Sequence, residues 1–217
     1  MVRRTIPMRL PEDLPALIEF NILPARYMHD SWFDQFRHGH MIYKLRACRR
    51  TEYKLSHYIL ECLGLSNSYC FDIPQPVSAV VLLPPAELVR MVRYLGACAN
   101  VSMLQRLIGK KQVQSIKNAI GEDAYLFGIK RAPYLVAGSE TPKLKSIMAR
   151  NLGDYITICG MCLLFAAFKD SSLALKKRLS LKFSYHWIQM MSQPVLLSGA
   201  SETHLLIERV RAEVIKS

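Results

Sequence analysis

The fold of this chain is decided by two stretches, EFNILPARYMHDSW at residues 19–32 and KKRLSLKF at residues 176–183. Each has the pattern of a short β-strand in a sequence that is otherwise helical. Residues 17–23 are mostly apolar and stop at a proline, and in residues 179–183 apolar and polar side chains alternate. Because an isolated strand leaves its backbone groups without partners, we predict that the two strands pair with each other.

This pairing defines the expected fold class. A lone strand pair is marginal in water and needs helices to pack against, and most of the chain has helical periodicity. We therefore expect a mainly α protein, a single helical domain over residues 1–217 with a minor β-strand pair that joins its N- and C-terminal segments. The expected helices cover residues 41–63, 86–99, 102–108, 110–120, 141–169 and 201–216, and residues 77–83 are expected to be a packed extended segment.

The composition is that of a soluble protein with a sizeable core, since 51% of the residues are hydrophobic. The longest apolar run, residues 155–168, is shorter than the ~20 residues that a membrane-spanning helix needs, and so predicts a buried core helix. The first twenty residues lack the apolar region of a signal peptide. The six cysteines are scattered rather than grouped as in a disulfide framework. These features favour free thiols in the cytoplasm.

The chain is strongly basic, with 29 Lys and Arg against 17 Asp and Glu, a formal net charge of +12. Such a charge favours an acidic protein, nucleic acid or an anionic membrane surface as the partner. The alternative is a basic solvated surface with no specific use, because net charge alone predicts function only weakly.

The sequence contains no assembled catalytic or metal-binding motif. Cys159 and Cys162 form the only Cys-x-x-Cys, but they lie inside an apolar helical run, and no second pair completes a zinc site. His29, His38 and His40 have no Asp, Glu or Cys at a recognisable metal-binding spacing. There is no glycine-rich phosphate loop and no Gly-x-Ser-x-Gly motif. We therefore expect no enzyme activity, no metal and no cofactor, although a carboxylate pair assembled only by folding stays open.

One group of cations is regularly spaced. On the helix expected from residue 41, Arg46, Arg50 and Lys54 recur every four residues on the side opposite Ile42 and Leu45. This cationic stripe is a candidate docking surface for an acidic partner, in which charge mainly raises the association rate and the selectivity. The alternative is the ordinary solvated face of a helix.

The two opening stretches also carry a family resemblance. The first has the pattern apolar-x-Phe-x-x-x-Pro-x-x-Tyr-x-His, with Phe20, Pro24, Tyr27 and His29, and the second has Arg-Leu-Ser-Leu at residues 178–181. In these positions the chain resembles the SctK family (YscK/PscK type) of the bacterial type III secretion sorting platform. The order of the helices expected between the two stretches also fits this family loosely.

The resemblance implies a non-enzymatic adaptor that acts by binding. Proteins of this family link the cytoplasmic domain of the inner-membrane ring protein SctD to the pod protein SctQ. The expected partners are therefore SctD, SctQ and other sorting-platform proteins, at the cytoplasmic face of the bacterial inner membrane and without direct membrane insertion.

The alternative function is a basic helical nucleic-acid-binding module, which would explain the net charge equally well. Against it, the basic residues do not interleave with aromatic residues in a recognition pattern, and no helix-turn-helix signature is present. An enzyme ranks third, since no site is assembled in the sequence.

Overall fold

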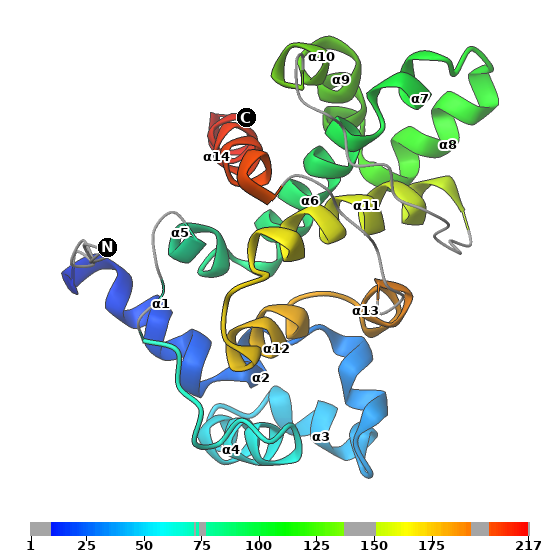
Figure 1. The fold of residues 1–217 in the computed structure, drawn as a ribbon. Coiled ribbons are helices and arrows are strands. Elements are labelled where there is room, and N and C mark those ends of the chain that lie inside the picture. The colour runs from blue at the N-terminus through cyan, green and yellow to red at the C-terminus, as the bar shows by residue number, and fades with distance from the viewer. Residues whose placement is uncertain (1–9, 72, 74–76, 137–150, 192–199, 217) are drawn as a thin grey trace. The chain divides into compact units, whose positions relative to one another are not determined.

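All regular elements that the structure describes are helices (Figure 1). The structure is a computed structural model, and it describes residues 10–71, 73, 77–136, 151–191 and 200–216. The chain divides into two compact units: unit 1 comprises residues 1–85 and 171–186, and unit 2 comprises residues 86–170 and 187–217. The single domain expected from the sequence stays a prediction. Among the described residues, no helix combines the length and the hydropathy required to cross a membrane.

Unit 1 is built from short helices that come from two separate parts of the chain, so that α12 joins helices from the first 85 residues. It contains α1 (Leu10–Ile22), α2 (Pro24–Tyr27), the 3-10 helix η1 (Asp30–Gln35), α3 (Gly39–Arg46), α4 (Glu52–Cys62), α5 (Val77–Val81), α12 (Leu173–Leu181) and the start of α13 (Tyr185–Met191).

The strand predicted for residues 17–23 is wrong, because this segment lies almost entirely in α1. Leu17, Phe20 and Asn21 are buried together, and their i, i+3, i+4 spacing is that of one helix face. Pro24 does open a short helix at its first turn, as its fixed φ favours. The sequence therefore places the break correctly but assigns the wrong conformation before it.

The strand predicted for residues 179–183 is also wrong, because α12 runs to Leu181. Leu175, Arg178 and Leu179 are buried at helical spacing. Apolar and polar residues do alternate from Leu179. Leu179 and Leu181 are nevertheless both buried in the last turn of α12, so their burial does not require a strand. Within the described residues no strand pair joins the two ends of the chain.

The two stretches do lie against each other, as helices and turns rather than as strands. The backbone N–H of His29 donates a hydrogen bond to the carbonyl of Leu181 at 2.8 Å. The indole Nε1 of Trp32 donates to the carbonyl of Phe183 at 2.9 Å. The connection between distant parts of the chain, which the strand prediction implied, is therefore made through different contacts.

The single helix expected for residues 41–63 is two helices, α3 and α4, which lie next to each other in Figure 1. Between them, the hydroxyl of Thr51 donates to the carbonyls of Leu45 and Cys48, both at 2.9 Å. The same two carbonyls also accept hydrogen bonds from the backbone N–H groups of Cys48 and Thr51, both at 3.0 Å, so the hydroxyl reinforces a turn that the backbone already closes. The segment expected to be extended, residues 77–83, is also mostly helical, as α5.

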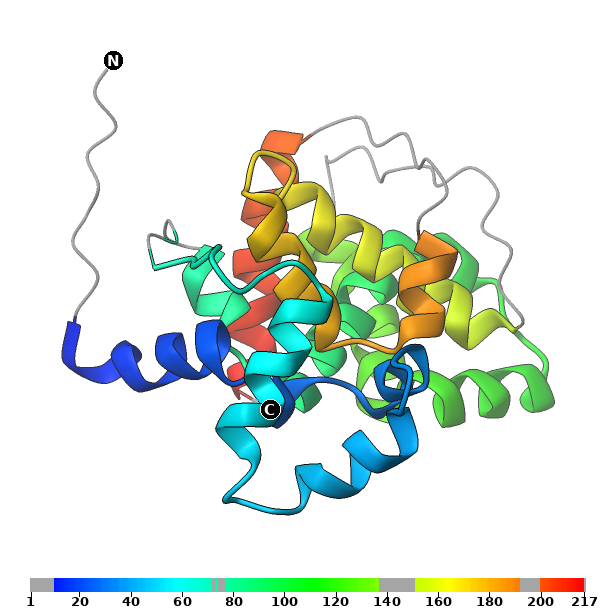
Figure 2. The same cartoon turned by 90° about the horizontal axis from the view of Figure 1, so that it is seen from below.

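Unit 2 has α11 among its other helices (yellow among green in Figure 2), and α11 packs against both α8 and α14. Its elements are α6 (Pro85–Ala99), α7 (Val101–Gln105), α8 (Lys110–Ile120), α9 (Glu122–Lys130), α10 (Ala132–Leu135), α11 (Leu152–Ala167), the rest of α13 and α14 (Ala200–Lys216). The predictions for α6, α8 and α14 are confirmed. The first residues of the helix predicted for 141–169 lie outside the described residues.

Two glycines allow α6 and α11 to approach closely. A Cβ atom at Gly160 of α11 would lie 1.8 Å from the carbonyl oxygen of Val92, and one at Gly96 of α6 would lie 2.0 Å from the carbonyl oxygen of Ile156. Both distances are far below contact distance, so no other residue fits at these positions without moving a helix. The apolar run of α11 is buried here, as expected from its composition.

Candidate functional site

Arg46, the first of the three predicted docking cations, is partly used inside unit 1. Its guanidinium forms an ion pair with Asp30 and donates to the carbonyl of Arg26 at 3.2 Å. It also lies over the ring of Phe33, 5.6 Å from the ring centroid. These contacts tie the end of α3 to η1, so Arg46 has a structural role in addition to any role in binding.

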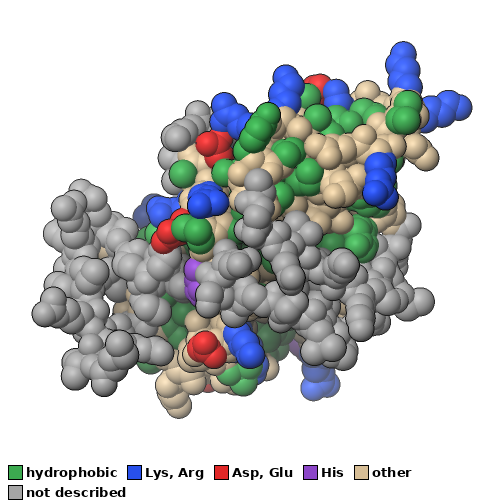
Figure 3. Space-filling view, turned by 45° about the horizontal axis from the view of Figure 1, so that its top comes forward, with side chains coloured by type: hydrophobic (Ala, Val, Ile, Leu, Met, Phe, Trp, Pro, Cys, Tyr) green, Lys and Arg blue, Asp and Glu red, His purple; other side chains and the backbone are tan. Residues whose placement is uncertain are grey.

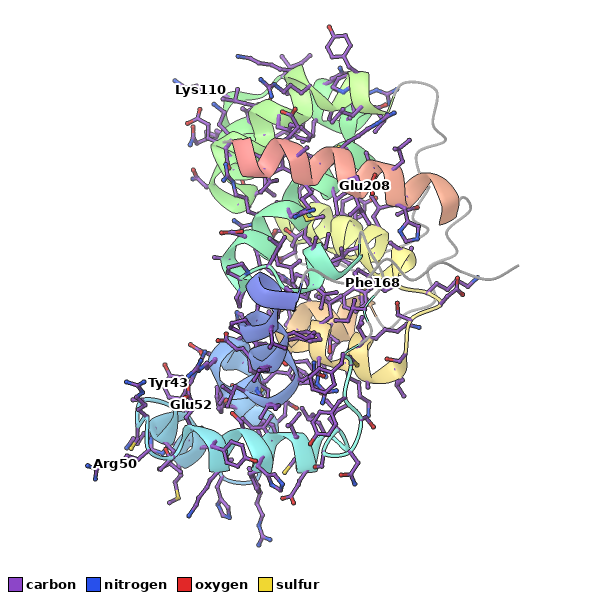
Figure 4. All side chains as sticks on the ribbon, turned by 90° about the vertical axis from the view of Figure 1, so that its left-hand side faces the viewer. Tyr43, Arg50, Glu52, Lys110, Phe168 and Glu208 are labelled. Carbon is purple, nitrogen blue, oxygen red and sulfur yellow. The ribbon has the colours of Figure 1, made fainter. Side chains whose placement is uncertain are left out.

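Arg50 and Lys54 are exposed, and neither forms an ion pair with the described residues. Arg50 lies in the turn between α3 and α4, and in Figure 4 it projects away from the ribbon. Lys54 lies in the first turn of α4. Because Arg46, Arg50 and Lys54 come from three different elements, the predicted stripe along one helix does not exist. Binding of a partner by these three residues stays a prediction.

The start of α4 is fixed by ion pairs to Arg26 of α2. Its guanidinium donates to both carboxylate oxygens of Glu52, at 2.6 and 2.9 Å, and to Glu19 at 3.1 Å. Hydrogen bonding from Arg26 holds the pKa of Glu52 below its usual range. Two-pronged contacts of this kind fix geometry as well as charge. Glu52 is therefore paired within unit 1, with the guanidinium that also pairs with Glu19.

The α3–α4 hairpin, residues 39–62, is consequently a basic surface. Between residues 37 and 57 the sequence has six cations and one carboxylate, and that carboxylate is Glu52. Large apolar side chains are exposed on the same hairpin, including Met41, Tyr43, Leu45 and Tyr53. These exposed side chains were not predicted from the sequence, because Leu45 was expected on the covered side of one long helix.

Most of the residues that carry the family resemblance, including Phe20, Tyr27 and Arg178, are buried in the interior of unit 1, whereas His29 is exposed. Arg178 has 0% of its surface exposed. Its Nη1 donates to the carbonyl of Ser68 at 2.6 Å, and its Nη2 donates to the carbonyls of Asn21 and Leu65 at 3.3 and 3.2 Å. This buried guanidinium, with its several carbonyl acceptors, joins α12 to α1 and to the segment that follows α4.

Lys182, one turn after Arg178, is a second buried cation. Its Nζ donates to the carbonyls of Val81 and Leu83, both at 2.7 Å. It also lies 5.4 Å from the ring centroid of Phe20 and 5.3 Å from that of Tyr27, within the range of cation–π attraction. Burial lowers the pKa of Lys182 to about 8. Lys182 is not part of the motif that carries the resemblance. Its i, i+4 spacing from Arg178 places both cations on the same face if the segment is helical.

Tyr27 and His29, two further residues of the resemblance, also have structural contacts. The hydroxyl of Tyr27 donates to the carbonyl of Phe20 at 2.7 Å, and burial raises the pKa of Tyr27. Nδ1 of His29 accepts a hydrogen bond from the backbone N–H of Ser31 at 3.2 Å and so caps η1. This cap is the role of a turn residue, in agreement with its place between two short helices.

The cysteines and histidines do not assemble into a metal site within the part of the chain that the structure describes. Cys159 and Cys162 are buried in α11, and Cys98 of α6 is buried as well. Burial raises the pKa of Cys98 and of Cys162 to about 12, so both remain thiols at neutral pH. His38 and His40 are exposed at the start of α3.

Unit 2 has a cavity of about 320 Å³ lined by Tyr94, Asp123, Phe127 and Lys130, among others. The carboxylate of Asp123 accepts hydrogen bonds from Nε of Arg90 at 2.9 Å and from the hydroxyl of Tyr94 at 3.3 Å. These groups are therefore engaged with one another, and their contacts connect α6 to the start of α9.

The described residues thus form a helical protein whose buried polar groups join helices and whose α3–α4 hairpin exposes a basic surface. The family model for YOP proteins translocation protein K (YscK) matches residues 16–216. The chain belongs to this family, which confirms the resemblance to the SctK (YscK/PscK-type) family of type III secretion sorting-platform proteins.

A solved structure has a similar fold. It is the cytoplasmic domain of the T3SS (type III secretion system) sorting platform protein PscK from P. aeruginosa. The chain is 21% identical to it, with a TM-score of 0.62, and the match covers 91% of this chain and 94% of that one. This agreement shows that the helical arrangement is shared. The comparison with curated proteins gives no match.

Proposed function

We propose that this chain is a non-enzymatic adaptor of the type III secretion sorting platform that links the cytoplasmic domain of the ring protein SctD to the pod protein SctQ. The observation that supports this proposal most is the match to the YscK family over nearly the whole chain, residues 16–216. The work of such a protein is to bind two partners at once, in the cytoplasm and at the inner face of the membrane, through contacts with the secretion apparatus.

The two compact units support binding of two partners through different surfaces. The α3–α4 hairpin is the candidate surface of unit 1, with Arg46, Arg50 and Lys54 as the cations proposed to contact an acidic partner. Of the three, Arg50 and Lys54 are the better placed, because Arg46 already pairs with Asp30. Exposed charge pairs mainly change the association rate, and their effect is screened by salt.

The test is co-purification of the full chain with the SctD cytoplasmic domain and with SctQ, followed by binding kinetics. The double variant Arg50→Glu/Lys54→Glu should slow association with one partner and leave the other unchanged. The difference from the wild type should shrink as salt rises from 0.1 M to 1 M, since the screening length falls from about 10 Å to about 3 Å.

A matched control is available in unit 2. Figure 3 shows Lys and Arg side chains standing out from the face that carries α7 to α10, and Lys110 and Lys111 are exposed at the start of α8. The variant Lys110→Glu/Lys111→Glu changes the net charge by the same amount. If both double variants slow the same partner equally, the effect is one of net charge, and the hairpin is not a specific contact. A wild-type chain that binds neither partner would contradict the adaptor function.

A further inference from the structure

We propose that the α3–α4 hairpin binds an acidic, partly apolar segment of a protein partner, and that Met41, Leu45 and Tyr53 hold the bound segment. This inference rests on the proposed function, and it adds the chemistry of the partner and the residues that retain it. The cations of the hairpin then attract the segment, while the three apolar side chains determine how long it stays.

The first observation is the exposure of the three side chains. Met41 is 63% exposed, Leu45 is 44% exposed and Tyr53 is 64% exposed. Met41 and Leu45 are four residues apart in α3 and therefore lie on the same side of that helix. Tyr53 follows at the start of α4. Met41 and Leu45 are therefore neighbouring exposed apolar residues, which mark interaction sites more often than scattered single ones do.

The second observation is that the hairpin is held to unit 1 by other residues. Ile42, Leu55, Ile59 and Leu60 are the buried apolar side chains of the two helices. The backbone N–H of Ala25 in α2 donates to the hydroxyl of Ser56 at 3.4 Å. Because these contacts face the interior, Met41, Leu45 and Tyr53 are left to contact a partner.

The third observation concerns charge, and it identifies the partner as acidic. Lys44, Arg50 and Lys54 form no ion pair with the described residues of the chain, and Glu52 is paired with Arg26. A basic partner would be repelled from this surface, whereas carboxylates beside an apolar segment would complement it. Met, Tyr and Arg are also enriched in protein interfaces relative to the rest of the protein surface.

These observations separate the two kinds of side chain in a way that kinetics can test. Desolvated apolar and aromatic anchors chiefly slow dissociation, whereas rim charges chiefly speed association. The apolar variants should therefore change the dissociation rate at any salt concentration. Charge variants should change the association rate, and only at low salt.

The experiment measures binding of the full chain to the immobilised SctD cytoplasmic domain and to SctQ. The variants are Tyr53→Ser and the double variant Met41→Ser/Leu45→Ser. Their matched controls replace apolar residues that are exposed elsewhere: Tyr134→Ser, at a residue that is 83% exposed, and Leu173→Ser, at one that is 68% exposed. Far-UV circular dichroism and the urea midpoint establish that each variant is folded.

The expected result is a dissociation rate from one partner that rises about 10-fold in each hairpin variant, with little change in the controls. Unchanged dissociation in both hairpin variants would overturn the inference and leave the adaptor function standing. If the wild type binds neither protein, the proposed function fails, and this inference fails with it.

Tyrosine and lysine side chains also bind anionic lipid, so a membrane surface is the alternative occupant of the hairpin. Binding to vesicles distinguishes this alternative from a protein partner. The probes are phosphatidylcholine vesicles with and without phosphatidylglycerol. If the hairpin variants weaken binding to the anionic vesicles and leave both protein partners unaffected, the occupant is lipid, and the inference is overturned. Protein binding that depends on the hairpin, with no vesicle binding, supports it.

Discussion

Nη2 of Arg178 donates a hydrogen bond to the main-chain carbonyl of Asn21, 157 positions earlier in the chain, at 3.3 Å. The two residues belong to the two stretches that carry the family resemblance. Arg178 is fully buried, and it binds the carbonyls of Ser68 and Leu65 as well. One side chain therefore connects α12, α1 and the segment that follows α4.

Replacing Arg178 should destabilise unit 1. In Arg178→Met the apolar side chain can be buried, but three carbonyls lose their donor, and each unsatisfied buried acceptor costs about 1–3 kcal/mol. We expect the free energy of unfolding in urea to fall by about 3 kcal/mol or more. The exposed Lys44→Met is the control and should stay within about 0.5 kcal/mol of the wild type. A variant of Arg178 as stable as this control would show that the buried hydrogen bonds contribute little.

The contact between the two stretches could be predicted from the sequence, but their conformation could not. A short apolar segment fits the period of a strand and that of a helix almost equally well. In residues 179–183 the alternating leucines favoured the strand. Burial of Arg178 and Lys182, which are spaced i, i+4, is what marks this segment as a helix. Cations are normally expected on the surface, so this burial pattern is not recognised without the tertiary structure.

The break between α3 and α4 shows a second limit. The turn Cys48–Thr51 contains neither glycine nor proline, so the usual signals for the end of a helix are missing. The break is instead fixed by the hydroxyl of Thr51 and by the pairing of Glu52 with Arg26 from α2. The candidate cations were identified by sequence, whereas the exposed Met41 and Tyr53 beside them required knowledge of which face is covered.

Lys182 should make the stability of the protein depend on alkaline pH. The unfolded chain keeps this proton up to about pH 10.5, whereas burial lowers the pKa of Lys182 in the folded chain to about 8. Between these values the unfolded state binds more protons, so stability rises with pH. The free energy of unfolding of the wild type, relative to that of Lys182→Met, should therefore increase by about 3 kcal/mol between pH 8 and pH 10.5.

The measurement is urea unfolding of both proteins across this pH range, and the quantity is the difference between their free energies of unfolding. Taking the difference removes the contributions of groups in other parts of the chain, such as the buried thiol of Cys98 in unit 2, whose pKa is raised to about 12. The exposed Lys177→Met should give a difference that does not change with pH. If the difference for Lys182→Met is flat as well, the ammonium is stabilised in place by its carbonyl and aromatic partners.

The close approach of α6 and α11 should not tolerate a methyl group. In Gly160→Ala the new Cβ would meet the carbonyl oxygen of Val92, which belongs to the helix backbone and cannot turn away. Overpacking of this kind costs about 1–3 kcal/mol and occasionally more. The control is Gly109→Ala, where the Cβ would meet only the side-chain end of Gln112. Equal thermal midpoints for the two variants would mean that α6 and α11 can move apart without a loss of stability.

The six cysteines should react in two groups with a thiol reagent in the folded protein. Cys48 and Cys62 are exposed, and hydrogen bonding from the backbone of Arg50 lowers the pKa of Cys48. The other four are buried. We expect two thiols to react quickly at neutral pH, and the double variant Cys48→Ser/Cys62→Ser to lose this fast phase. Fast reaction of more than two thiols, before urea is added, would show that the interior opens readily.

Arg46 and Arg50 should differ in what they contribute, although both were assigned to the same stripe. Arg46→Met loses the ion pair with Asp30 and the contact with Phe33, and because this site is partly exposed, stability should fall by only about 1 kcal/mol. Arg50 forms no ion pair with the described residues, so the stability of Arg50→Met should stay within about 0.5 kcal/mol of the wild type.

For binding, the order should reverse. Arg50 projects into solvent and can meet the carboxylates of an arriving partner, whereas the charge of Arg46 is already balanced by Asp30. Arg50→Met should therefore slow association with one partner at low salt more than Arg46→Met does, and high salt should remove the difference. Both quantities are measured on the same protein samples, by urea unfolding and by association kinetics. If Arg46→Met slowed association more and cost no stability, its pairing with Asp30 would not persist in solution, and Arg46 would be the main docking cation of the hairpin.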